Sequence, residues 1–173
     1  GQTVSIIDPV TAKVRQAQVF VAVLGSSSYT YVEATWTQGL ADWTASHVRC
    51  FEFLGGVPKA VVPDNLKTGV QKPNYYEPDL NPLYASMLEH YGVVADPARV
   101  SDSDRKGTVE NAVKHTQATA LKGRKFETIE AQNEWLMHWE SRWAAPRAIP
   151  ARAISPRRPS WWWSSRAPGS DAQ

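Results

Sequence analysis

The sequence has only one cysteine, Cys50, so it holds no internal disulfide framework and no cysteine-rich zinc site. It lacks any stretch near the roughly 18 consecutive apolar residues that a membrane helix needs. No signal-peptide pattern opens the chain, and Gly55-Gly56 has the context of a helix stop rather than a phosphate loop. We therefore expect a soluble, cytoplasmic protein with no membrane partner.

The chain also lacks a general excess of positive charge. Residues 1–143 carry 14 Lys and Arg against 16 Asp and Glu. Residues 144–173 carry five Arg, and Asp171 is their only acid. This balance excludes a uniformly basic nucleic-acid binder, and any charge that binds DNA must be local.

Residues 144–173 contain no Lys, Leu, Val, Phe or Tyr, but they hold five prolines and three consecutive tryptophans. Such a segment could be a basic, aromatic arm for nucleic acid. Its Ala, Arg, Pro, Gly, Ser and Trp content is also typical of GC-rich DNA translated out of frame, with a frame break near residues 144–147. We favour the second interpretation, and predict a core of residues 1–143 followed by a disordered tail.

The core has the hydropathy pattern of a mixed α/β protein. Apolar alternation and turn residues predict strands over Gln2–Ile7, Gln16–Leu24, Tyr29–Thr35, Ala60–Val62 and Val93–Ala95. Helical spacing predicts helices over Gln38–Phe53, Pro82–Tyr91, Asp104–Leu121 and Ile129–Trp143. A three-stranded meander, a helix and then strand–helix–strand–helix is the element order of a ribonuclease H-like fold. We expect a mixed sheet of about five strands flanked by helices.

Two sets of residues look functional but are better explained by packing. His47 lies on the apolar face of its helix with Leu40, Trp43 and Phe51, and no histidine has the spacing of a metal site. Trp135, Trp139 and Trp143 recur every fourth residue, which favours a packing stripe over a platform for stacking bases.

Two carboxylates occupy positions where a metal site could form. Asp64 follows a short apolar strand, at the strand end where open α/β sheets bind ligands. Glu110 lies on a predicted helix, one residue from its apolar stripe. Such acids can hold Mg²⁺, and two ions can activate a hydroxyl that attacks a phosphodiester. Asp64 could equally be a turn residue, and Glu110 an exposed helical glutamate.

The surroundings of Glu110 favour a phosphate partner. Between Arg99 and Lys125 there are seven Lys and Arg against three acids, and Lys114 lies one helical turn after Glu110. A lone acid inside a basic segment suits a metal site beside a DNA backbone. The alternative is a solvated helix with one ion pair at i,i+4 spacing.

Several motifs together resemble the IstA-like transposases of bacterial insertion sequences. Val61-Val62-Pro63-Asp64-Asn65-Leu66-Lys67-Thr68-Gly69-Val70 is similar to the family's second-aspartate motif. Lys106-Gly107-Thr108-Val109-Glu110-Asn111 is similar to the motif of its last acid. The likeness covers residues 1 to about 143, and further matches occur at Tyr76–Pro82, His90–Gly92 and Pro97–Arg99.

The resemblance implies an integrase-type catalytic core that uses three acids and two Mg²⁺ or Mn²⁺ ions to cut transposon ends and join them to target DNA. It makes Asp64 and Glu110 catalytic metal ligands. The residues that it assigns to DNA binding are Asn65, Lys67, Arg99, Arg105, Lys106 and Lys114. It also implies a homo-oligomer on DNA, association with the nucleoid when bound, and a separate AAA+ ATPase helper.

By this resemblance, the family's first aspartate would lie on the first strand, just ahead of Gly1. Asp8 is the nearest acid, but it lies in the turn after the first strand, where we expect it to point away. We therefore expect metal-dependent strand cleavage and transfer in the intact protein, and little or none from this chain, which would represent a fragment or a decayed gene. The alternative function is a non-catalytic DNA-binding or assembly fragment that inhibits intact transposase. A two-carboxylate glycosidase is disfavoured by the basic setting of the acids.

Overall fold

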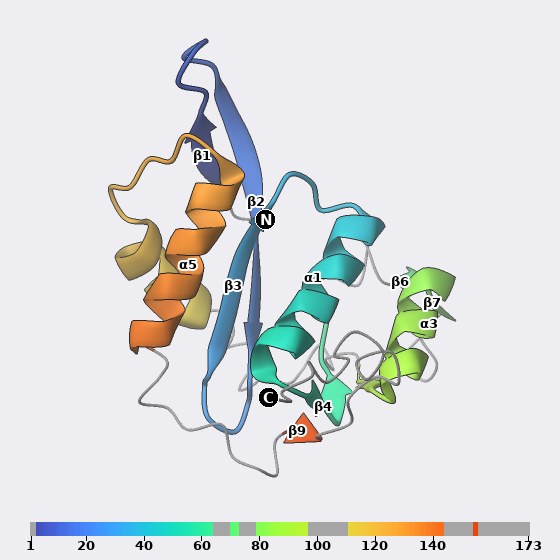
Figure 1. Cartoon of the computed structure of the whole chain (residues 1–173). Coiled ribbons are helices and arrows are strands. Elements are labelled where there is room, and N and C mark those ends of the chain that lie inside the picture. The colour runs from blue at the N-terminus through green and yellow to red at the C-terminus, as the bar shows by residue number, and fades with distance from the viewer. Residues whose placement is uncertain (1–2, 64–69, 73–78, 97–110, 144–153, 156–173) are drawn as a thin grey trace, which may run out of the picture.

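A computed structural model describes residues 3–63, 70–72, 79–96, 111–143 and 154–155 of the chain. The chain begins with an antiparallel meander of β1 (Thr3–Ile7), β2 (Val14–Val23) and β3 (Thr30–Thr35), in the order β1-β2-β3 (Figure 1). Val4 lies opposite Ala17, and Val19 lies opposite Ala34. β2 is the central strand, and its apolar residues on both faces are typical of a strand in that position.

The two faces of the meander are covered by different helices. On one face, Tyr31 packs against Cys50 and Leu54 of α1 (Leu40–Leu54). On the other face, Val32 packs against Leu136 of α5 (Ile129–Trp143). The alternation along β3 therefore separates two cores, as the sequence predicted, and the result is a helix–sheet–helix stack (Figure 1).

α1 ends at Gly55, whose φ of +69° is the left-handed conformation that glycine adopts without a Cβ penalty. Beside α1 lies α3 (Pro82–Tyr91), where the Asn81 side chain accepts a hydrogen bond from the Leu83 N–H at 3.1 Å. Tyr84 of α3 is fully buried and packs in one cluster with Phe51 of α1.

The helix predicted up to Leu121 is present where the structure describes it. Residues 111–116 are α-helical, and η1 (Gln117–Leu121) continues them as a π-helical turn. Ala120 is fully buried against α5 and the sheet, and Thr116 is 1% exposed. Both lie on the predicted apolar stripe.

The remaining strands are short and form three separate pairs. β5 (Ala60–Val61) and β8 (Val94–Ala95) are parallel. The other pairs are antiparallel: β4 (Val57–Pro58) with β9 (Ile154–Ser155), and β6 (Val70–Lys72) with β7 (Asp79–Leu80).

A mixed α/β architecture is thus confirmed. Within the described residues the strands form one three-stranded sheet and two-stranded pairs, so a continuous five-stranded sheet stays a prediction. Most of the predicted tail lies outside the described residues, and its Ile154–Ser155 pairs with β4. None of the helices in the described ranges is long and apolar enough to cross a membrane.

Candidate functional site

The parallel pair of β5 and β8 defines one edge where ligands could bind. Val61 lies opposite Ala95, and the Asp96 N–H donates to the Val61 carbonyl at 2.8 Å. Because the strands are parallel, their carboxyl ends meet at the same edge. Asp96 is exposed and directly follows β8. Asp96 was not among the predicted site residues, although it follows an apolar strand just as Asp64 does.

Most of the predicted site residues lie outside the described residues. These are Asp64, Asn65, Lys67, Arg99, Arg105, Lys106 and Glu110. Lys114 is described, and it is exposed on the helical segment of residues 111–116. The structure therefore fixes elements that flank the predicted site: β5 ends three residues before Asp64, and residue 111, which follows Glu110, is helical.

The described residues do not by themselves supply a metal site. Among them, no group of three or more His, Cys, Asp or Glu could hold an ion. Asp8 is used in a turn, as predicted: its Oδ1 accepts hydrogen bonds from the N–H groups of Val10 and Thr11, both at 2.9 Å. These two bonds lower the pKa of Asp8 because they stabilise its ionised form.

His47 is a core residue, as predicted. Its ring is 8% exposed and makes edge contacts with Phe20, Trp43 and Tyr84. Its Nδ1 lies 2.9 Å from the Trp43 carbonyl oxygen. Burial lowers the pKa of His47 because the charged ring would lose its hydration there.

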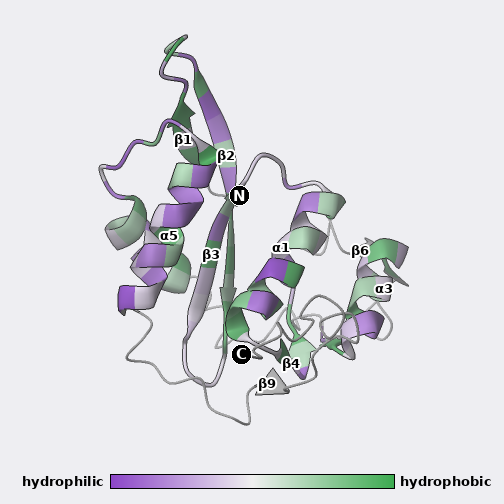
Figure 2. Ribbon diagram, in the orientation of Figure 1, coloured by the Kyte–Doolittle hydropathy of each residue, from purple (hydrophilic) through white to green (hydrophobic). Residues whose placement is uncertain are grey.

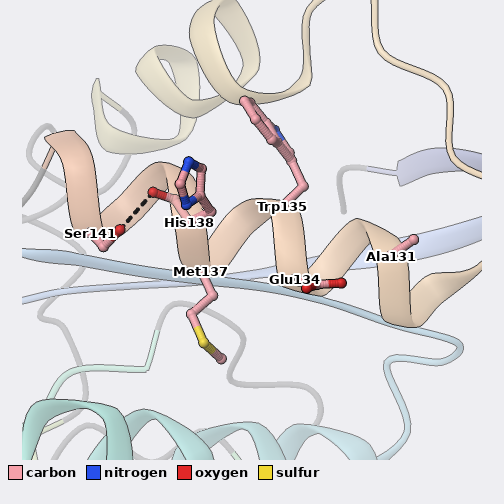
Figure 3. A pocket seen from close by; sticks show the side chains of 6 residues that line it. All are labelled: Ala131, Glu134, Trp135, Met137, His138 and Ser141. Atoms are coloured by element: carbon pink, nitrogen blue, oxygen red, sulfur yellow. Dashed lines mark hydrogen bonds between the residues drawn. The ribbon is translucent and has the colours of Figure 1, made fainter.

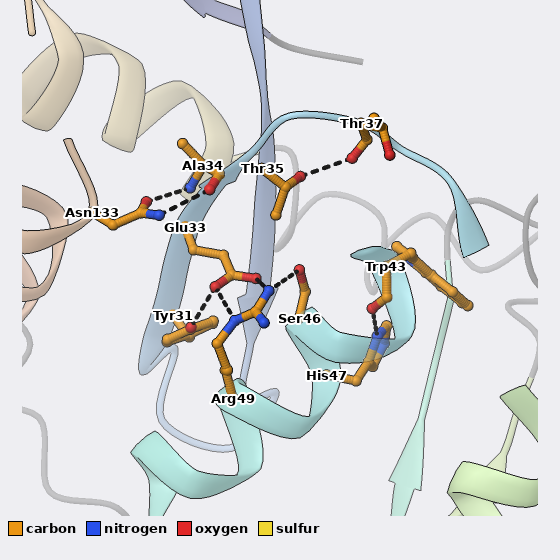
Figure 4. A network of polar contacts seen from close by, with 10 residues as sticks. All are labelled: Tyr31, Glu33, Ala34, Thr35, Thr37, Trp43, Ser46, His47, Arg49 and Asn133. Carbon is orange, nitrogen blue, oxygen red and sulfur yellow. Dashed lines mark hydrogen bonds and ion pairs between the residues drawn. The ribbon is translucent and has the colours of Figure 1, made fainter. Parts of the chain in front are cut away.

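A buried carboxylate, Glu33, lies at the interface of β3 and α1 (Figure 4). Arg49 donates to both of its oxygens, at 2.7 and 2.8 Å, and the Tyr31 hydroxyl donates to Oε2 at 3.0 Å. The hydrogen-bonded Glu33 carboxylate raises the pKa of Arg49. Burial raises the pKa of Tyr31, and the negative charge of Glu33 adds to this rise. Because these bonds occupy Glu33, we assign it to the packing of α1 rather than to metal binding.

A second buried acid, Glu140, extends from α5 to β3. Its Oε1 accepts the Val32 N–H, and its Oε2 has no partner among the described residues. The pKa of Glu140 is raised to about 8, chiefly by burial. The hydrogen bond from Val32 lowers the pKa, and the nearby charge of Glu33 raises it further. A perturbed acid is often functional. This one is 1% exposed and bonded to a strand, which indicates a structural role.

Asn133 of α5 makes a paired contact with the same strand. Its Oδ1 accepts the Ala34 N–H at 2.7 Å, and its Nδ2 donates to the Ala34 carbonyl at 2.9 Å (Figure 4). β3 is an edge strand of the meander. The two α5 side chains therefore complete hydrogen bonds that another strand would otherwise make.

The tryptophans of α5 pack as predicted where they are described. Trp139 is 7% exposed and packs in one cluster with Val32. Trp135 donates its indole N–H to the Ala120 carbonyl at 2.9 Å and points toward η1 (Figure 3).

The hollow in Figure 3 lies along a single face of α5, where Met137 is 61% exposed and the Ser141 hydroxyl donates to the His138 carbonyl at 2.8 Å.

This sequence is similar to proteins named as transposases, one of them the transposase of a bacterial insertion sequence. A Sinorhizobium fredii protein provisionally named a transposase is 43% identical over 136 residues, which is 77% of this chain. A Mycobacterium tuberculosis protein with the same provisional name is 35% identical over 88% of the chain. The transposase for insertion sequence element IS21 of Pseudomonas aeruginosa is 30% identical over 69% of the chain.

The matched residues cover 26%, 37% and 31% of the lengths of these three relatives. The chain thus corresponds to less than half of each of them. No family model matches the chain.

Proposed function

We propose that this chain, which is homologous to part of the insertion-sequence transposases, is the catalytic-core segment of such an enzyme. Its substrate would be DNA, and its reaction metal-dependent strand cleavage and strand transfer. The observation that carries this proposal is the sequence identity of 30–43%, over the matched residues, to three proteins named as transposases. The mixed α/β architecture is compatible with the ribonuclease H-like core that we propose.

The catalytic residues in this proposal are Asp64 and Glu110. Bound Mg²⁺ or Mn²⁺, two ions in the intact site, would polarise the phosphodiester and lower the pKa of the attacking hydroxyl. Carboxylate oxygens are suitable ligands for both ions. Asn65 and Lys67 would position the DNA beside Asp64, and Lys114 would contact a phosphate one turn beyond Glu110.

The described elements support this placement of the acids. Asp64 follows β5, whose carboxyl end meets that of β8. The helical residues 111–121 are anchored by Ala120, which is buried against α5 and the sheet, and Thr116 of the same segment is 1% exposed. An acid at the start of this helix would be held by a rigid element. Asp96 lies at the same strand edge and is a further acid for this site.

The first test is nicking of supercoiled plasmid DNA in Mn²⁺. It is performed on the 173-residue chain and on the chain extended upstream in its reading frame. We expect stronger nicking by the longer chain. In that longer chain, Asp64→Asn and Glu110→Gln should each reduce nicking at least about 100-fold, because each removes a metal ligand. Glu89→Gln, at an exposed position of α3, is the control and should nick normally.

The outcomes separate the two functions considered for the chain. Nicking that survives both substitutions would reject Asp64 and Glu110 as the catalytic acids. Salt-sensitive DNA binding without nicking, unchanged by both substitutions, would instead favour the non-catalytic fragment that inhibits intact transposase. The homo-oligomer and the AAA+ ATPase helper are part of the same proposal.

A further inference from the structure

The β1–β2 hairpin lies beside the loop that joins η1 to α5. The Ile7 N–H donates to the Phe126 carbonyl at 2.9 Å, and Ile6 forms a parallel bridge with Phe126. Across the hairpin, Ile6 lies opposite Arg15. Two segments that are far apart in the sequence therefore lie side by side at one end of the molecule (Figure 1).

Exposed cations from both segments gather at this end. We call them the cationic ridge; its members are Lys13, Arg15, Lys122, Arg124 and Lys125. The segments 8–15 and 121–127 hold these five cations against two acids, Asp8 and Glu127. Residues 1–143 as a whole carry more acids than bases, so the ridge is a local concentration of positive charge.

The described structure does not neutralise these cations. Among the described residues, the ion pair observed is that of Arg49 with Glu33, which lies at the α1 interface. The two ridge arginines stack on indole rings instead: Arg15 lies 3.8 Å from the Trp36 ring centre, and Arg124 lies 3.5 Å from that of Trp135. A stacked guanidinium is held in place while its in-plane N–H groups can still donate to phosphate oxygens.

The hairpin projects from the body of the molecule (Figure 1), and hydrogen bonds close its turn. The Asp8 N–H donates to the Lys13 carbonyl at 3.0 Å, and the Ala12 N–H donates to the Asp8 carbonyl at 2.9 Å. Val10 at the tip is 91% exposed. Figure 2 shows the hydrophilic residues of β2 concentrated toward the hairpin and the hydrophobic ones along the rest of the strand. A two-stranded ribbon of this kind is narrow enough to enter a DNA major groove.

We propose that the cationic ridge is a DNA-binding surface, with the β1–β2 hairpin and the loop before α5 contacting the phosphate backbone of a duplex. This inference rests on the proposed function, and it joins Lys13 and Arg15 of the hairpin to the C-terminal end of the basic segment between Arg99 and Lys125. The ridge would position the duplex and would contribute affinity without sequence specificity.

The test is binding of a fluorescent 30-base-pair duplex to the full chain as salt is varied. Lys13→Gln with Arg15→Gln removes two ridge charges, and Lys122→Gln with Lys125→Gln removes two others. Lys59→Gln with Arg142→Gln is the matched control, because both residues are exposed and lie outside the ridge. Each lost phosphate contact should reduce the log–log salt slope by about 0.9. We expect each ridge pair to lower affinity at least about tenfold near 0.1 M salt.

The control variant should lower affinity less than about threefold, because charges outside the ridge affect DNA binding only through the overall electrostatic potential of the protein. Equal losses in the control and in both ridge pairs would overturn the proposal, as would a wild-type chain that does not bind the duplex at low salt. Circular dichroism melting verifies that each variant is folded. Nicking that persists while the ridge variants bind normally would reject the ridge and leave the proposed function intact.

Discussion

The two buried glutamates of β3 and α5 differ in how their charge is compensated. Glu33 receives a bidentate guanidinium and a hydroxyl, so both of its oxygens have partners inside the interface. Glu140 receives one backbone N–H and has a buried oxygen without a described partner. Burial therefore favours the protonated form of Glu140, and its pKa rises to about 8.

We predict that Glu140 makes the stability of the chain fall as pH rises. Its pKa of about 8 in the folded chain lies above the ordinary value of 4.5, so folding takes up a proton between these two values. The stabilising effect of the protonated form is complete below pH 4.5 and is lost as pH rises through 8. Glu140→Gln should therefore stabilise the chain more at pH 9 than at pH 5, by at least about 2 kcal/mol.

The measurement is urea unfolding of both proteins at pH 5, 7 and 9. The difference between the two proteins at each pH removes the contributions of other groups, such as His47. Glu130→Gln, at an exposed position of the same helix, is the control and should show no such trend. A constant difference across this pH range would mean that Glu140 is ionised at no cost in the folded chain.

At the scale of elements, α5 protects an open edge of the sheet. β3 has β2 on one side, and on the other side its backbone groups at Val32 and Ala34 bond to side chains of α5. Unpaired strand edges can recruit another strand and aggregate. Two further polar groups of α5 are buried without a hydrogen-bond partner among the described residues, namely Gln132 Nε2 and Trp139 Nε1. We infer that α5 acts as the cover of this edge.

We predict that Asn133→Ala uncovers the edge at Ala34. The variant loses two hydrogen bonds and leaves a peptide group of a buried strand unpaired, which should cost about 1–3 kcal/mol in unfolding free energy. The Ala34 amide should exchange with solvent at least about tenfold faster in native-state hydrogen exchange. Glu134→Ala, an exposed neighbour on α5, serves as the control.

An Ala34 amide that remains equally protected in Asn133→Ala would show that the side chain does not cover the edge. Faster exchange accompanied by a concentration-dependent increase in size would show, in addition, that the uncovered edge recruits a second chain.

At the scale of the whole molecule, the boundary at residue 143 separates a packed body from a segment of different composition. The body has helices on both faces of its meander and a further cluster between α1 and α3. Of the later segment, Ile154–Ser155 pairs with Val57–Pro58. This contact has two residues on each strand, and so short a pairing contributes little stability.

We predict that a chain ending at Trp143 folds nearly as stably as the full chain. Cross-strand pairs contribute about 0.2–1 kcal/mol each, so removing β9 should lower the unfolding free energy by no more than about 2 kcal/mol. Urea unfolding of the two chains measures the difference. A loss above about 4 kcal/mol, or failure of the shorter chain to fold, would place the boundary elsewhere.

The sequence predicted the main elements closely because their patterns are local. The helix ending at Gly55 and the helix starting after Asn81 follow from capping residues that act within one turn. Strand ends differ from the prediction by one or two residues, as in β2, which begins at Val14. The π-turn of η1 could not be predicted, because it accompanies a tertiary bond from Trp135 to the Ala120 carbonyl.

The candidate site, like the fold, has a part that the sequence predicts and a part that depends on tertiary contacts. The motifs around Asp64 and Glu110 are contiguous in the sequence, so resemblance could identify them without a structure. Asp96 and the cationic ridge could not be identified in this way, because strand pairing and the contact between Ile7 and Phe126 bring them together.

Sequence alone thus determined the composition limits, the order of the longer helices and strands, and the likeness to insertion-sequence transposases, since each depends on neighbouring residues or on short motifs. The short strands β4, β6, β7 and β9 were not predicted. Only the tertiary structure decided that Glu33 is paired by Arg49, that α5 covers the edge of β3, and that Lys13 and Lys125 belong to one surface. The physical reason is that burial and charge depend on distances between residues far apart in the chain, which no local pattern encodes.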